Sequence, residues 1–367
     1  MTDLARVVEA VRAFEEGQIV VVTDDDDREN EGDLILAAEH ATPEKIAFII
    51  RHTSGIVCTP ITAADARRLH LQPMVAHNEA PLSTAFTVTI DYREGLTTGI
   101  SAEERCNTVR AILNPNVGAE DFVRPGHIFP LIARDGGVLM RSGHTEAAID
   151  LCRLADLKTV GVLSELVNDD GTVMRGPQVT GFAEEHGLKV VSVAELIAYR
   201  QRKERLVERV EAFEVDTPYG PARAYTYSTP WDPMQHLAVV FGDISDGVDI
   251  PVRLHLESVV GDVFGRDSTV EPFIKRIAEG GRGIVVYLRE GSVGVGKVPS
   301  QRRAANDDEG HDTAKVRQEE WREIGLGAQI LTDLEVHSIR LLASRERHYV
   351  GLGGFDIVIN ETEIVDG

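Results

Sequence analysis

The apolar residues of the first half of the chain alternate between helical spacing and short continuous runs. Between Leu4 and Phe14 they recur every three or four residues, which predicts an amphipathic helix ending at Gly17. Unbroken apolar runs predict buried strands, and capping residues mark the helix starts. The predicted strands are 19–22, 34–38, 56–58, 86–91 and 160–167. One further predicted helix begins at residue 42, another begins at residue 102, and a third runs through 146–154. Such interleaving predicts an α/β (α+β) fold with a mixed sheet packed with helices.

The second half repeats this mixture. Its predicted strands are 222–227, 236–241, 252–256 and 283–288, with helices at 270–278 and 328–334. A capping box at Ser192–Glu195 opens a helix that we expect to continue through Val210, with the domain junction on it. We therefore predict two domains, residues 1–205 and 206–367, each a mixed β-sheet with helices. The polar, charged segment 299–318 is predicted to be a mobile or disordered loop.

Composition narrows the function. The 367 residues carry a formal net charge of −22, which argues against nucleic acid as a general partner. An acidic protein that handles a phosphorylated substrate must concentrate positive groups locally or recruit a metal. The first 17 residues resemble no signal peptide, and no apolar run approaches membrane-spanning length. Three unpaired cysteines, Cys58, Cys106 and Cys152, suit a reducing cytoplasm.

An acidic connection joins the strands at 19–22 and 34–38. Seven of the ten residues from Asp24 to Asp33 are carboxylates, and only Arg28 is basic. This much like charge is costly unless a positive group lies nearby. A solvated acidic turn, a divalent cation bound by oxygen ligands, or Arg28 folded onto its neighbours would each relieve it. The two flanking strands favour a loop rigid enough to hold ligands.

A second polar motif, Arg141-Ser142-Gly143-His144-Thr145-Glu146, opens a predicted helix after a predicted strand. Free N–H groups at a helix N-terminus attract phosphate, and Gly143 permits close approach of the anion. An ordinary capped helix start is the alternative. His144 and Glu29 together fit magnesium or manganese, although a lone histidine is more often a hydrogen-bonded core or surface residue.

The acidic segment resembles the signature loop of 3,4-dihydroxy-2-butanone 4-phosphate synthase, with Asp26 in place of the usual Glu. The motif at 141–146 and segments 97–101, 126–131 and 161–166 extend the resemblance over residues 5–200. It implies conversion of ribulose 5-phosphate to a four-carbon phosphate and formate for riboflavin, in a homodimer. It implies Mg²⁺ or Mn²⁺ on Glu29 and His144, and acid/base roles for His127 and Glu165 with Cys58 near the reacting carbons. The expected substrate-binding residues are Arg28, Glu29, Asp33, Thr98, Arg141, Ser142, Gly143, His144, Thr145 and Glu165.

Residues 212–360 resemble GTP cyclohydrolase II, which holds a zinc ion on three cysteines. Ser258, Thr269 and Glu271 stand at the matching positions, and no cysteine follows Cys152, so we expect no zinc. Arg322 matches the family's catalytic arginine. We expect a folded domain without cyclohydrolase activity and with a structural or regulatory role. Two alternatives are a bifunctional protein that opens GTP by another route, and a sensor that binds a nucleotide.

Overall fold

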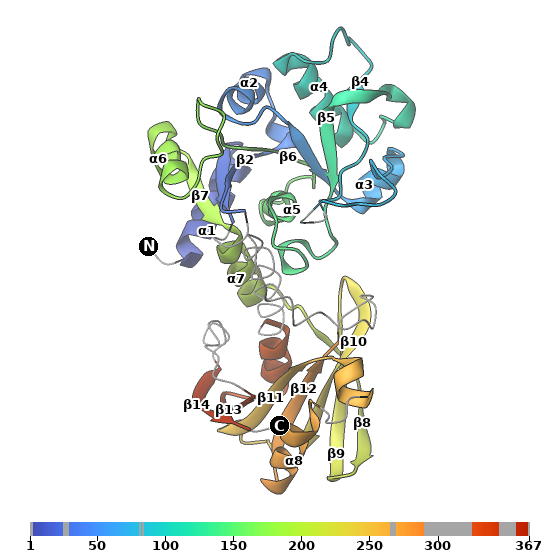
Figure 1. Ribbon diagram of the computed structural model, residues 1–367, viewed down its shortest axis with the longest axis vertical. Coiled ribbons are helices and arrows are strands. Elements are labelled where there is room, and N and C mark those ends of the chain that lie inside the picture. The colour runs from blue at the N-terminus through green and yellow to red at the C-terminus, as the bar shows by residue number, and fades with distance from the viewer. Residues whose placement is uncertain are drawn as a thin grey trace, which may run out of the picture. The chain divides into compact units, whose positions relative to one another are not determined.

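The computed structural model describes residues 3–24, 29–80, 82, 84–264, 269–289, 325–344 and 357–365. The chain divides into two compact units, one ending at Tyr199 and the other beginning at Arg200 (Figure 1). Each unit contains a mixed seven-stranded sheet packed with helices, which confirms the predicted fold class. The domain bounds 1–205 and 206–367 stay a prediction.

The first unit has the strand order β4-β5-β3-β6-β2-β1-β7. Its strands are β1 (Val20–Thr23), β2 (Gly32–Ala37), β3 (Cys58–Ile61), β4 (Ile90–Tyr92), β5 (Phe122–Ile132), β6 (Gly161–Glu165) and β7 (Lys189–Ser192). Its helices are α1 (Asp3–Glu15), α2 (Pro43–His52), α3 (Ala63–Arg68), α4 (Ala102–Leu113), α5 (His144–Leu154), α6 (Pro177–His186) and α7 (Val193–Lys203). Pairs β1–β7 and β3–β5 are parallel and the others antiparallel.

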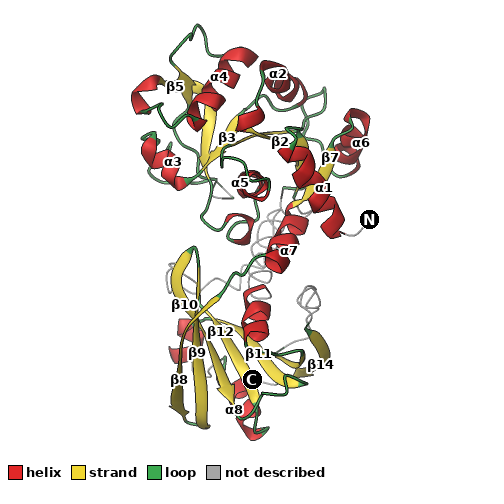
Figure 2. Cartoon of the chain, turned by 180° about the vertical axis from the view of Figure 1, so that it is seen from behind, coloured by secondary structure: helices red, strands yellow, loops and turns green. Residues whose placement is uncertain are grey.

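Strand β2 shows how the two faces of this sheet are filled. Leu34 and Leu36 join a hydrophobic cluster with residues of α2, α4 and α6. Because side chains alternate along a strand, Asp33 and Ile35 point to the opposite face. Helix α5 packs against β2, β3 and β6 and lies on the other side of the sheet from α2 and α4 (Figures 1 and 2).

The strand register brings four polar side chains to that α5 face. Asp33 pairs with Glu165 on β6, and two residues earlier on β6 Leu163 pairs with Cys58 on β3. Cys58 in turn pairs with Phe129 on β5, two residues after His127. Directly paired residues and residues two apart share a face of a sheet. Asp33, Glu165, Cys58 and His127 therefore lie on one face, toward one edge of the sheet.

The second unit has the strand order β14-β13-β11-β12-β10-β9-β8. The strands are β8 (Glu208–Thr217), β9 (Gly220–Thr229), β10 (Asp232–Phe241), β11 (Ile250–Leu256), β12 (Gly283–Leu288), β13 (Ser338–Ala343) and β14 (Val358–Ile364). Strands β8, β9, β10 and β12 form an antiparallel series, whereas β12, β11, β13 and β14 are parallel. Helix α8 (Glu271–Glu279) packs on the sheet through Phe273 and Ile277.

The structure corrects two predicted elements. Helix α7 ends at Lys203, and residues 208–217, expected to begin within that helix, form strand β8. Pairing with β9 along the whole of β8 outweighs the helical spacing of Leu206, Val207 and Val210. The strand expected before Arg141 is instead a short 3-10 helix at Gly137–Leu139. The segment 299–318 lies outside the described residues.

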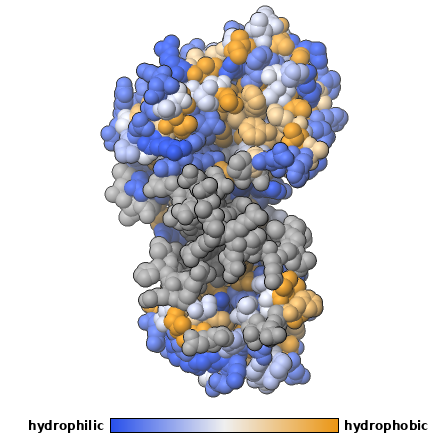
Figure 3. Space-filling view, viewed as in Figure 1, coloured by the Kyte–Doolittle hydropathy of each residue, from blue (hydrophilic) through white to orange (hydrophobic). Residues whose placement is uncertain are grey.

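Hydrophilic residues predominate on the face drawn in Figure 3. Within the described ranges, no helix combines the length and the apolar character needed to cross a bilayer.

We predict that Leu36→Ala destabilises the first unit by about 2–5 kcal/mol, because Leu36 is fully buried in the cluster beneath α2 and α4. Urea denaturation followed by circular dichroism measures the change. Val8→Ala is the matched control, since Val8 is 52% exposed and its truncation should alter stability by less than about 0.5 kcal/mol. Equal effects of the two substitutions would contradict the assignment of this core.

Candidate functional site

Asp24 organises the acidic loop. It is buried directly after β1, and its two carboxylate oxygens accept hydrogen bonds from the backbone N–H of Glu29 (3.0 Å) and of Glu31 (2.9 Å). Asn30, between these donors, has φ 53°, a left-handed conformation that asparagine tolerates better than most residues. Residues 29–31 are thus held by one carboxylate before β2 begins. Arg28, predicted to bind substrate or neutralise the loop, lies outside the described residues.

His144 brings a second element to this loop. Its Nδ1 lies 3.5 Å from Glu29 Oε2 and 3.8 Å from Asp33 Oδ2. His144 is the first residue of α5, so the helix start and the acidic loop meet as the sequence predicts. Asp24, Glu29 and His144 each offer a ligand atom within 4.8 Å of the others.

In the absence of a cation, the carboxylates of this site outnumber its one imidazole. Burial raises the pKa of Asp33 to about 8, although His144 opposes the change. Burial alone would lower the pKa of His144, but Asp33, Glu29 and Asp24 outweigh it and raise that pKa to about 9. Burial and neighbouring carboxylates also raise the pKa of Glu31. The metal-free site therefore favours bound protons, which a divalent cation would replace.

The donor set fits a hard divalent cation. Carboxylate oxygens with one imidazole suit Mg²⁺ or Mn²⁺ when water and substrate oxygens complete the coordination. Two buried atoms, Asp33 Oδ1 and His144 Nε2, have no hydrogen-bond partner among the described residues. Unsatisfied buried polar atoms are rare and mark places where a ligand, ion or water is needed.

The start of α5 is built as an anion site. Gly143 is the N-cap residue in an extended conformation, and no side chain there accepts a hydrogen bond from the first turn. Ser142 and Thr145 are buried beside it. Arg141, predicted to bind substrate, donates to Glu146 Oε2 (2.7 Å) and Thr84 Oγ1 (3.1 Å). Its guanidinium is thus held close to the helix start, already paired with a buried carboxylate.

Glu165 stands at the end of β6 opposite Asp33. Its Oε2 accepts a hydrogen bond from Ser54 Oγ (2.8 Å). Cys58, 2% exposed, lies one strand away, and burial followed by the charges of Glu165 and Asp33 raises the pKa of its thiol. Cys58 is therefore a neutral thiol that packs beside the carboxylates rather than a thiolate nucleophile.

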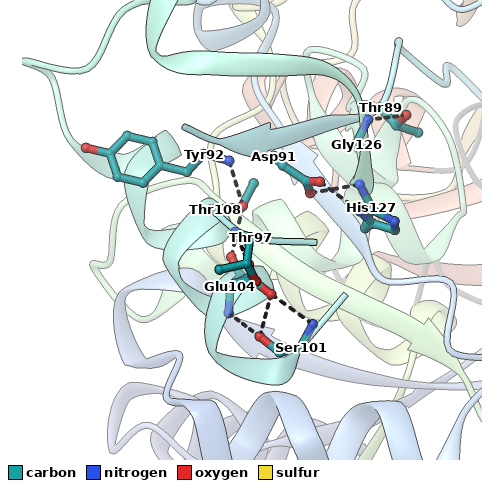
Figure 4. Close-up of polar contacts among 9 residues, drawn as sticks. All are labelled: Thr89, Asp91, Tyr92, Thr97, Ser101, Glu104, Thr108, Gly126 and His127. Carbon is teal, nitrogen blue, oxygen red and sulfur yellow. Dashed lines mark hydrogen bonds and ion pairs between the residues drawn. The ribbon is translucent and has the colours of Figure 1, made fainter. Parts of the chain in front are cut away.

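His127 lies on β5, with its ring 40% exposed. The loop between β4 and α4 carries Thr98, which is exposed, and Gly99, which is buried against the His127 ring. Asp91, on the neighbouring strand β4, bonds both the backbone and the ring of His127 (Figure 4).

Sequence reasoning missed three residues of this site. Asp24 was one of seven carboxylates, and nothing local distinguished it except its position at the end of an apolar run. Ser54 and Asp91 contact Glu165 and His127 across 111 and 36 residues of chain. Only the strand order brings these pairs together.

Comparison with known proteins identifies the family of the chain. Residues 8–199 match the family model of 3,4-dihydroxy-2-butanone 4-phosphate synthase. The chain belongs to this family. Residues 208–364 match the GTP cyclohydrolase II family. One relative is the bifunctional riboflavin biosynthesis protein RIBA 1 of Arabidopsis thaliana, 47% identical over 96% of this chain and 67% of that protein. Riboflavin biosynthesis protein RibBA of Salinispora arenicola is 45% identical over 98% of this chain and 88% of that protein.

Two solved structures bear on the site. RibBX from A. baumannii, a two domain 3,4-dihydroxy-2-butanone 4-phosphate synthase, matches with a TM-score of 0.81 and 38% identity, covering 98% of this chain and 99% of that one. A 3,4-dihydroxy-2-butanone 4-phosphate synthase in complex with two magnesium ions matches 54% of this chain and 97% of its own, with 42% identity and a TM-score of 0.52.

In the second unit, Ser258, Thr269 and Glu271 each take part in hydrogen bonds. Thr269 Oγ1 donates to Asp262, Ser258 Oγ accepts from the N–H of Gly261, and Glu271 accepts from the hydroxyl of Tyr219. Hydroxyl groups are poor zinc ligands at neutral pH. In the part of the chain that the structure describes, the clustered metal-ligand side chains are those of the acidic loop and His144.

The carboxylate of Asp262 accepts hydrogen bonds from several groups in this region. It accepts hydrogen bonds from His255 Nε2 (3.0 Å), Tyr287 OH (2.7 Å) and the N–H of Ser258 (2.9 Å), besides Thr269. Burial alone would raise the pKa of Asp262, but these hydrogen bonds hold it below its usual value. An ionised carboxylate that already has four donors leaves little capacity for a metal ion.

We predict that the full chain binds Mn²⁺ at the cluster of Asp24, Glu29 and His144. Glu29→Gln and His144→Asn should each weaken binding by about 100-fold, because each removes a ligand. Electron paramagnetic resonance of free Mn²⁺ gives the affinity. Glu39→Gln removes an exposed carboxylate elsewhere and should leave it unchanged. Unchanged affinity in the first two variants would locate the metal elsewhere.

Proposed function

We propose that the chain converts D-ribulose 5-phosphate to L-3,4-dihydroxy-2-butanone 4-phosphate and formate, in riboflavin biosynthesis. One observation carries the proposal: a cation-binding cluster, an uncapped helix start and the side chains of Glu165 and Cys58 meet on the α5 face of one sheet. The substrate needs each of these, since it has adjacent oxygens for a metal, a phosphate for the helix start, and protons that must be moved.

The residues divide the work by position. The N-terminus of α5, with Ser142, Gly143 and Thr145, holds the phosphate remote from the reacting carbons and so supplies binding energy. When bound to Glu29 and His144, a divalent cation supplies charge stabilisation to the oxygens of the sugar. Arg28, Asp33, Thr98 and Arg141 are the further residues that we assign to substrate binding.

We assign the proton transfers to His127 and Glu165. Glu165 has one oxygen oriented by Ser54, which leaves the other to exchange protons with substrate. Cys58 lies on the same face one strand away and supplies a buried, neutral wall next to the reacting carbons. The reaction needs no redox cofactor: loss of a proton beside the carbonyl, loss of water, a skeletal shift, and addition of a water molecule that releases one carbon as formate balance by themselves.

A homodimer with sites at the subunit interface is part of the proposal. Ile56 and Ile100 are 47% and 52% exposed, and they flank Cys58 and the Thr98 loop. Apolar side chains exposed beside a polar site favour a surface that a second copy covers. The cytoplasmic location that we propose is supported by three buried, free cysteines.

For the second unit we propose a structural or regulatory role without cyclohydrolase activity. Support comes from the absence of cysteine after Cys152 and from the engagement of Ser258, Thr269 and Glu271 in separate hydrogen bonds. The matching catalytic arginine, Arg322, lies outside the described residues. A bifunctional protein that also acts on GTP, or a nucleotide-binding sensor, remains the alternative.

We predict Mg²⁺-dependent formate release from ribulose 5-phosphate by the full chain. Glu165→Gln and His127→Asn should each lower kcat by about 10²–10⁴-fold, the range of general acid–base contributions. Asp170→Asn, an exposed carboxylate in the turn after β6, should stay within about 2-fold of the unaltered protein and controls for charge loss near the site. If the metal-loaded protein releases no formate, a sugar-phosphate binding protein becomes the better assignment.

We predict that the full chain holds no stoichiometric zinc and leaves GTP intact. Replacing Ser258, Thr269 and Glu271 together with cysteine should bring in about one zinc ion per chain, because thiolates are the ligands that are missing. Elemental analysis gives the zinc content and chromatography follows GTP. Turnover of GTP by the unaltered chain would establish the bifunctional alternative, and saturable binding without turnover the sensor.

A further inference from the structure

Asp91 and His127 form a close pair on adjacent strands (Figure 4). Asp91 Oδ1 accepts a hydrogen bond from the backbone N–H of His127 (2.8 Å), and its Oδ2 lies 2.7 Å from the ring Nδ1. The Asp91 side chain is 4% exposed whereas that of His127 is 40% exposed. The carboxylate is therefore inside the fold, and the ring reaches from it toward solvent.

This geometry selects one form of the imidazole. An ionised carboxylate can only accept hydrogen bonds, so the ring nitrogen facing Asp91 must carry the proton. Nδ1 is then the donor, and in the neutral ring Nε2 is left with a free lone pair. The nitrogen on the exposed side of the ring is thus the one able to take or give a proton.

The loop before α4 packs on the pair. Gly99 has φ +82°, and a Cβ there would overlap Asp91 Oδ2 and lie 2.6 Å from His127 Nδ1. Glu104 fixes this loop by accepting hydrogen bonds from Thr97 N–H (2.6 Å) and Thr97 Oγ1 (2.8 Å). The backbone at Gly99 therefore excludes water from the Asp91–His127 hydrogen bond.

The two strands are also held in place around the pair. The N–H of Tyr92, next to Asp91, donates to Thr108 Oγ1 on α4 (2.9 Å), and the N–H of Gly126, next to His127, donates to Thr89 Oγ1 (3.0 Å). These bonds fix both backbones without touching the ring. A substitution at Thr108 would loosen β4 but keep the Asp91 carboxylate. It therefore distinguishes the effect of a loosened strand from the effect of losing that carboxylate.

We propose that Asp91 is a positioning residue, which orients His127 and keeps its proton on Nδ1 so that Nε2 faces the substrate. The assignment of that substrate rests on the function proposed above, but the state of the ring does not. Asp91 contacts no reacting atom in this scheme and acts through His127 alone.

Asp91→Asn is the sharpest test because it keeps the size of the side chain. The amide oxygen can accept from the backbone N–H of His127, and the amide nitrogen then donates to Nδ1, which moves the ring proton to Nε2. In another enzyme, trypsin, such an exchange beside a catalytic histidine lowers kcat about 10⁴-fold. We expect kcat for formate release to fall at least about 100-fold, with KM for ribulose 5-phosphate within about 3-fold.

Nitrogen NMR of the full chain labelled only at histidine reads the tautomer directly, and the signal missing in His127→Asn assigns the ring. The unaltered protein should show neutral His127 protonated on Nδ1, and Asp91→Asn should show it protonated on Nε2. Thr108→Val should lower thermal stability yet keep the Nδ1 tautomer and kcat. Glu94→Gln alters an exposed carboxylate that accepts a hydrogen bond from Tyr92 OH, and it should change neither the tautomer nor kcat.

An Nε2-protonated ring in the unaltered protein would overturn the proposal even if no variant folds. It would also be overturned if Asp91→Asn lowers kcat without moving the proton, since the role would then be structural. A tautomer switch in a protein that releases no formate would uphold the positioning role and refute the proposed reaction instead.

Discussion

The site depends on the buried carboxylate of Asp24. Its two oxygens accept hydrogen bonds from the N–H groups of Glu29 and Glu31, which holds these two acidic residues beside a third carboxylate. Glu29 then faces His144, and Asp33 enters β2 beneath the same imidazole. The repulsion that remains favours binding of a cation, because burial removes the water that would otherwise screen it.

The sheet converts this local arrangement into an active-site surface. Asp33, Glu165, Cys58 and His127 come from four strands, and their common face follows from register alone. A shift of one residue in any of these pairings would turn a side chain to the opposite, apolar face. Packing of Leu34 and Leu36 against α2 and α4 therefore fixes the register of β2, which keeps the polar residues on their face as well as filling the core.

Local features of the site and fold were visible in the sequence, and features set by chain topology were not. Thr42 and Ser101 cap their helices as predicted, because a cap depends on residues within one turn. The meeting of Glu29 with His144 was reached through a family resemblance, since 115 residues separate them in the numbering. Asp91 and Ser54 had no such signal. Strand β8 was missed because most of its residues are exposed on both faces, which removes the alternation that marks a strand.

In the second unit one carboxylate, that of Asp262, links several elements of the sheet. Asp262 joins β11, β12 and the segment before α8, with His255 on β11, Tyr287 on β12 and Thr269 before α8 as donors. A buried carboxylate whose donors are all in place stabilises the packing around it. Hydrogen bonding to Asp262 thus ties β11, β12 and the segment before α8 together.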